Sequence, residues 1–121
     1  MKFESYNPVD EKGGCVVRSI SKVLNKDYFE VKNDLIKLSK ELNYDDYREV
    51  EVFEYYLHQN NFKDLDMKDI LVKDLNLESG KYLVFCFKSD WYHMLTIIDN
   101  TIYDKNKDAL DLTVLKVYKG E

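Results

Sequence analysis

The fold class rests on residues 81–98, which read KYLVFCFKSDWYHMLTII. Two apolar and aromatic runs, Lys81 to Phe87 and Tyr92 to Ile98, flank the polar Lys88-Ser89-Asp90. Apolar runs of this length bounded by polar residues are typical of buried strands, and a short polar break between them favours antiparallel pairing. We therefore predict that the second half of the chain forms a β-sheet.

Two more strands are expected after this pair. Asp99-Asn100 predicts a two-residue turn into a strand at Thr101 to Tyr103, and Leu112 to Tyr118 supplies the last strand. The expected sheet is antiparallel and has about four strands.

The first half of the chain has helical periodicity instead. After the Gly13-Gly14 turn, apolar residues recur every three to four positions up to residue 25, and the same spacing predicts helices over 27–42 and 47–58. The second helix begins with an aspartate as its cap and a glutamate three residues later. A short turn is expected at 72–75. Helices followed by strands indicate an α+β fold, with the helices packed on the sheet.

Composition indicates one folded domain over residues 1–121. Hydrophobic residues make up 45% of the chain and charged residues 34%, as in globular proteins rather than disordered chains. One proline and four glycines leave no segment with the composition of a linker. A chain of this length is expected to build one hydrophobic core.

Charge and hydropathy exclude several function classes. The net charge is −5 and the basic residues are scattered among acidic ones, so we expect no nucleic-acid partner. No apolar run approaches the roughly 18 residues that span a bilayer, and the start, MKFESYNPVD, lacks the apolar core of a signal peptide. We expect a cytoplasmic protein without a membrane partner, in which Cys15 and Cys86 are free thiols.

Cys15 is the candidate nucleophile. It follows two glycines and opens the first helix, where unpaired backbone N–H groups and the positive end of the helix dipole favour a thiolate. Position alone leaves the alternative that Cys15 is a small buried hydrophobic residue, so its role depends on its partners.

His93 and Asp104 are the candidate partners. His93 lies near the start of one predicted strand, and Asp104 closes the next, 11 residues on. A hairpin that turns at Asp99-Asn100 brings the two side chains together. A nucleophile on a helix N-terminus, a histidine and an orienting carboxylate are the groups that a thiol hydrolase requires.

These segments resemble papain-like cysteine peptidases. The similarity lies in the helix opening GGCVVRSIS at residues 13–21, in Tyr92-His93-Met94 and in Ile102-Tyr103-Asp104, and is greatest to small bacterial and phage members. The resemblance implies a single papain-like domain with an active site between helices and sheet. It also implies thiolate attack on an amide or isopeptide bond through an acyl-enzyme thioester, with Cys15, His93 and Asp104 as the catalytic triad.

One position departs from that family. Papain-like enzymes place a glutamine about six residues before the cysteine to stabilise the oxyanion, but this chain has Val9 there. Asn7 is the nearest amide side chain and is the candidate oxyanion donor, with a cap on the Pro8 turn as the alternative. An idle triad in a binding module, which holds a host protein or a small molecule in the same cleft, is therefore the rival prediction.

Other residues point to no further chemistry. The two cysteines and two histidines contain no closely spaced ligand pair, and no phosphate-binding or dinucleotide-binding glycine motif occurs, so neither a metal nor a cofactor is expected. His58 and Cys86 are predicted to be structural. The expected partner is a protein or peptide substrate, or a small-molecule ligand in the cleft. The sequence separates neither hydrolase from acyltransferase nor one oligomeric state from another.

Overall fold

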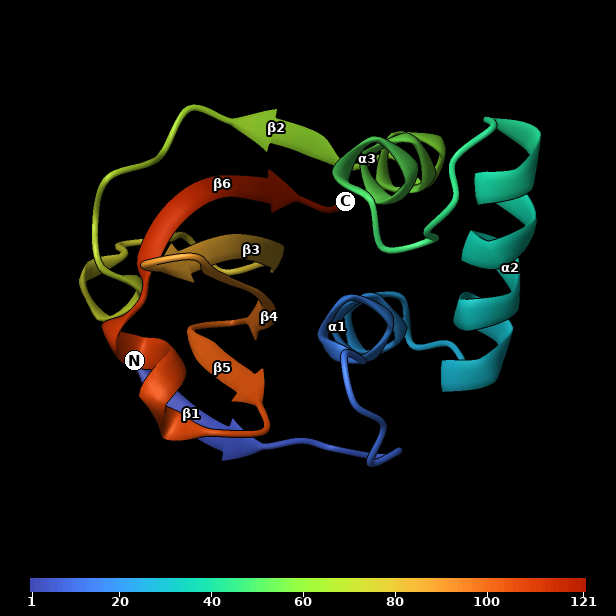
Figure 1. The fold of residues 1–121 in the computed structure, drawn as a ribbon. Helices are drawn as coiled ribbons and strands as arrows, with labels where there is room; N and C mark the ends of the chain where they lie inside the picture. The colour runs from blue at the N-terminus through green and yellow to red at the C-terminus, as the bar shows by residue number, and fades with distance from the viewer.

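The computed structural model describes residues 1–121 and is an α+β protein. Three helices come in succession and lie on one side of the sheet (Figure 1). The helices are α1 (Cys15–Leu24), α2 (Tyr28–Glu41) and α3 (Val50–Gln59). The strands are β1 (Lys2–Ser5), β2 (Lys63–Leu65), β3 (Lys81–Lys88), β4 (Trp91–Ile98), β5 (Thr101–Asp104) and β6 (Thr113–Lys119). None of the helices has both the length and the hydropathy needed to cross a membrane.

The sheet is mixed and has six strands, so the prediction of about four antiparallel strands was wrong. The strand order is β1-β5-β4-β3-β6-β2. The four predicted strands form the antiparallel centre, while β1 joins β5 in parallel at one edge and β2 joins β6 at the other. Both added strands are short and mostly exposed, which is usual for edge strands because only one side of each is paired.

The central strands pair as two hairpins, and the second one turns at Asp99-Asn100 as predicted. Lys81 pairs with Ile98 and Lys88 with Trp91, so β3 and β4 match along their full length. In the next hairpin Ile98 of β4 pairs with Thr101 of β5, so the turn between them has two residues. Its two residues, Asp99 and Asn100, have φ values of 48° and 63°, the left-handed conformation that a two-residue hairpin turn requires.

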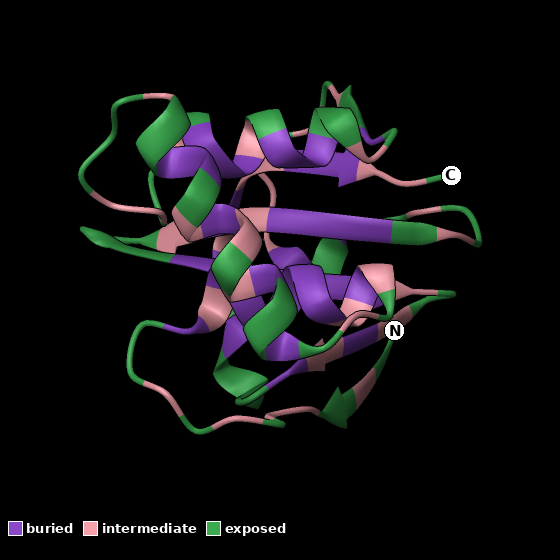
Figure 2. Cartoon of the chain, turned by 90° about the vertical axis from the view of Figure 1, so that its right-hand side faces the viewer, coloured by how far each residue is buried: buried purple, intermediate pink, exposed green.

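Hydrophobic cores lie on both faces of the sheet. The larger cluster joins the three helices to one face, through residues such as Ile20, Leu35 and Phe53. The smaller cluster covers the other face and is closed by two short 3-10 turns, Val72–Asp74 and Lys107–Asp111, which Figure 1 shows opposite the helices. Figure 2, which faces the helices, shows buried and exposed stretches alternating along each of them, as expected of amphipathic helices.

Two helix starts show how the local sequence sets the boundaries. Asp27 caps α2 as predicted, because its carboxylate accepts hydrogen bonds from the N–H groups of Phe29 and Glu30 at 3.0 and 3.2 Å. Helix α3 starts at Val50 rather than at residue 47. The carboxylate of Asp46 binds both the backbone N–H and the guanidinium of Arg48, and this local loop takes up the residues that periodicity assigned to the helix.

Candidate active site

Cys15 is the first residue of α1, as predicted. The residue before it, Gly14, has no side chain to cap the helix, so the N–H groups of the first turn point outward without a side-chain acceptor. A Cβ atom at this position would meet the hydroxyl of Tyr28 and the carbonyl oxygen of Glu11, so a larger residue fits only if these neighbours shift. The half-buried thiol of Cys15 thus sits beside a set of backbone donors.

His93 and Asp104 lie in direct contact. The Nε2 atom of His93 is 2.6 Å from Oδ2 of Asp104. Both side chains are buried, and Asp104 is only 1% exposed. The hairpin of β4 and β5 therefore brings these two residues together, as the sequence predicted.

The imidazole of His93 also interacts with the thiol of Cys15. Burial by itself would raise the pKa of Cys15, but hydrogen bonding to His93 and the charge of its ring together lower the pKa below its usual value. Burial acts on His93 in the opposite sense, yet its hydrogen bonds to Asp104 and Cys15 raise the pKa of His93 to about 9. Because Nε2 is bound to Asp104, Nδ1 is the ring atom left for the thiol. The lowered pKa of Cys15 and the raised pKa of His93 together favour a thiolate–imidazolium pair at neutral pH.

Arg18 is a fourth member of the cluster that the sequence analysis missed. Its Nη2 atom donates to Oδ1 of Asp104 at 3.0 Å, and the side chain is buried. Each oxygen of Asp104 thus has a nitrogen partner, one from Arg18 and one from His93. The available signal was the spacing, since a residue three positions after Cys15 shares its face of the helix. A buried carboxylate needs such partners because an unpaired buried charge is strongly destabilising.

Two further hydrogen bonds hold α1 against β4. The hydroxyl of Ser19 donates to the carbonyl of Met94 at 2.9 Å, and the hydroxyl of Thr96 donates to the carbonyl of Ser19 at 2.7 Å. These buried bonds fix how far along the strand the helix lies. The nucleophile on the helix and the histidine on the strand therefore have a fixed separation.

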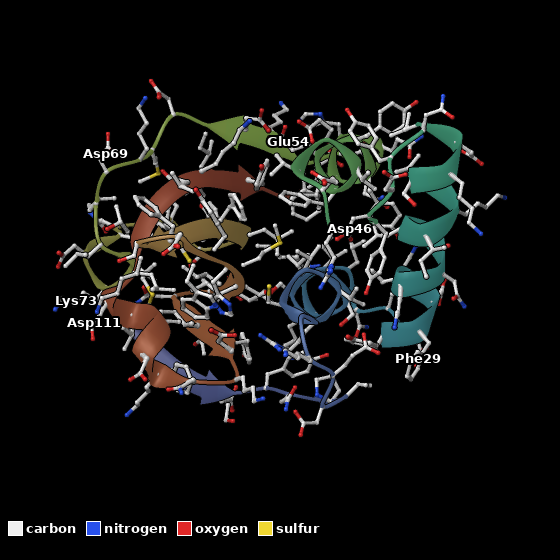
Figure 3. All side chains as sticks on the ribbon, viewed as in Figure 1. Phe29, Asp46, Glu54, Asp69, Lys73 and Asp111 are labelled. Carbon is white, nitrogen blue, oxygen red and sulfur yellow. The ribbon has the colours of Figure 1, made fainter.

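Cys15 opens into a cleft of about 590 Å³. The apolar part of its wall comes from α1, the start of α3 and the hairpin of β3 and β4: Val16, Val50, Phe85 and Tyr92. The rest of the rim consists of Gly13, before α1, and of charged residues in the connection between α2 and α3, where Figure 3 labels Asp46 between α1 and α3. The thiol thus faces a cavity large enough for an amino-acid side chain or more.

Asn7 does not lie where an oxyanion donor is needed. Its amide nitrogen donates to Oδ1 of Asp10 at 3.5 Å, and its buried Oδ1 has no partner. Neither Asn7 nor Val9 lines the cleft of Cys15. The backbone N–H groups at the start of α1 are the donors that the structure offers beside the thiol.

The remaining cysteine and histidine lie outside this cluster. Cys86 is fully buried in β3, where burial raises the pKa of its thiol, and its Sγ donates to the carbonyl of His93 at 3.4 Å. His58 is exposed and lies 2.9 Å from Asp64. No group of three or more His, Cys, Asp or Glu side chains is arranged to hold a metal ion.

Comparison with family models, with curated proteins and with solved structures gave no match for this chain.

Proposed function

We propose that this protein is a cysteine hydrolase of the papain-like kind that cleaves an amide or isopeptide bond. Cys15 is the nucleophile, His93 the base and then the acid, and Asp104 the group that orients His93. The observation that carries the proposal is the arrangement of the three groups: a thiol with a lowered pKa at a helix N-terminus, paired with an imidazole that a buried carboxylate holds at 2.6 Å.

The reaction follows from these positions. The thiolate of Cys15 attacks the carbonyl carbon, and the carbonyl oxygen takes the negative charge beside the N–H groups at the start of α1. The imidazolium of His93 then gives its proton to the amide nitrogen, so that the C–N bond breaks, the amine leaves and a thioester remains. Water attacks the thioester while His93 accepts its proton, and cleavage of the C–S bond releases the acid and restores the pair.

The cleft of Cys15 suits the acyl part of the substrate, since that part stays bonded to sulfur. The cleft is lined by Cys15 but not by His93. Phe85 and Tyr92 supply an aromatic wall, with ring centroids 5.9 Å apart and planes 13° from parallel. An apolar acyl group is expected to bury most surface there.

A non-catalytic binding module is the second candidate, and one observation favours it. No side-chain amide lines the cleft, so backbone N–H groups are the available oxyanion donors. Loss of one donor typically slows such reactions by about 10² to 10³. In a binding module the cleft would hold its ligand without turnover.

Acylation with p-nitrophenyl acetate, followed by intact-protein mass spectrometry, separates the two candidates. A hydrolase is expected to release p-nitrophenol, to carry a transient acetyl group on Cys15 and to turn over repeatedly. Cys15→Ser should lose this activity, whereas the control variant Cys86→Ala should keep it, because Cys86 does not line the cleft and its thiol forms its hydrogen bond with the backbone of His93. An acetyl group that stays on Cys15 would favour the binding module. No acylation of Cys15 would overturn the hydrolase proposal.

A further inference from the structure

A second hollow lies on the other side of the histidine. It has a volume of about 280 Å³, and its wall includes His93, Trp91, Arg18 and Lys105 but not Cys15. The indole of Trp91 stacks on the imidazole of His93, with ring centroids 5.1 Å apart and planes 18° from parallel. The hollow therefore borders the imidazole of His93 on the side of Asp104, whereas the larger cleft borders the nucleophile.

The position of the hollow decides which part of a substrate it would meet. In the proposed mechanism the acyl part stays on the sulfur of Cys15, and the amine part takes a proton from His93. The amine part must therefore lie on the side of the histidine. The leaving nitrogen itself must meet Nδ1, between Cys15 and His93, and a hollow lined by His93 but not by Cys15 is placed to hold a group that this nitrogen carries.

Arg18 gives this hollow its chemical character. Its side chain is about nine-tenths buried, at 7% exposure, and its one hydrogen bond runs from Nη2 to Asp104. The other two guanidinium nitrogens, Nε and Nη1, donate to no atom of the chain, and neither is sealed from the surface. Free N–H groups on a buried guanidinium offer charge-assisted hydrogen bonds to a carboxylate.

The other charged groups around the hollow leave an excess of positive charge. Lys105 adds a second cation. Its ion pair with Asp10 is weak because both side chains are exposed to solvent, so Lys105 is free to turn toward a ligand. Asp104 is already bound to Arg18 and His93, and Asp108 is the other carboxylate on the wall. With His93 protonated, three cations face two carboxylates.

We propose that this hollow binds a carboxylate on the amine side of the substrate. The favoured substrates are then amides whose leaving group is an amino acid with a free carboxylate, held by Arg18 and Lys105 against Trp91. This assignment rests on the proposed hydrolase function, but the binding of the carboxylate is measurable without turnover.

The single tryptophan provides the readout. Trp91 is the only tryptophan of the chain, so its indole N–H gives one signal in a ¹H–¹⁵N NMR spectrum. We would titrate the full-length Cys15→Ser variant with N-acetylglycine and, as a matched neutral probe, with N-acetylglycinamide. The acid should shift the Trp91 signal in a saturable way, and the amide should not. Equal responses to both probes, or none to the acid, would overturn the proposal.

Two lysines form a matched pair of variants. Lys105→Ala removes a charge from the wall of the hollow, and Lys107→Ala removes the same charge from an exposed neighbour outside it. The first should weaken binding of N-acetylglycine about two- to fivefold, the range for a partly exposed ion pair, and the second should leave it unchanged. Equal effects of the two variants would mean a general charge effect and would overturn the assignment. Because these measurements use a chain without the nucleophile, their failure is distinct from a failure of Cys15 acylation.

Discussion

Replacing His93 by alanine should make Cys15 about tenfold or more slower to react with iodoacetamide at pH 7. An ordinary thiol, with a pKa of about 8.5, is only about 3% ionised at that pH. In the variant the ionised fraction should be lower still, because burial is the largest single influence on the pKa of Cys15 and raises it. In the wild type the pair with His93 lowers this pKa and keeps the thiolate populated. Compared with an ordinary thiol, full ionisation could raise the rate by at most about 30-fold, and a low-pKa thiolate is a weaker nucleophile, which offsets part of this gain.

The assay is alkylation over pH 5 to 10, followed by mass spectrometry of the peptides. In the wild type the rate should rise with pH to a plateau below the usual thiol pKa, and it should change again only near pH 9, where the imidazolium of His93 loses its proton. Buried Cys86 is the internal reference, and His58→Ala, at the exposed histidine, is the matched control. Equal midpoints near 8.5 in wild type and His93→Ala would refute the reasoning.

Asp104→Asn should lower the pKa of His93 below about 9, because the carboxylate that favours the imidazolium is gone. A pH titration of the NMR signals of the His93 ring protons measures this pKa. The same change leaves Arg18 buried without an ionic partner and should lower the free energy of unfolding in urea by about 3 kcal/mol, so a loss under about 1 kcal/mol would contradict the buried ion pair. Gly14→Ala should lower the free energy of unfolding in urea by about 1 to 3 kcal/mol, since the new Cβ would collide with the hydroxyl of Tyr28. Wild-type stability of this variant would mean that the Tyr28 side chain moves aside freely.

The central hairpins and three site residues could be predicted from the sequence because each depends on local patterns. Asp99-Asn100 fixes the turn, the turn fixes the register, and the register brings Asp104 to His93. Cys15 followed from the helix start after two glycines. These features need only the alternation of strands and the geometry of a tight hairpin.

The features that were missed depend on distant partners. β1 has the sequence KFES, which carries no strand pattern of its own and becomes a strand by pairing with β5. Arg18 bonds to a carboxylate 86 residues away; its spacing from Cys15 placed it on the right face of the helix, but the usual exposure of arginine gave no sign of its burial. The start of α3 shifted because the side chain of Asp46 competes for the backbone of Arg48.

The parallel pairing of β1 with β5 has a consequence for synthesis on the ribosome. Lys2 pairs with Thr101, so the first strand waits for almost the whole chain before it gains its neighbour. At about 5 to 20 residues per second, Cys15 emerges several seconds before His93 and Asp104. During that interval the nascent chain holds an ordinary thiol, which should be no more reactive than that of a short peptide. A stalled chain that ends before residue 93 should therefore show the slow alkylation of an unpaired cysteine, so that reactivity at Cys15 marks the completion of the fold.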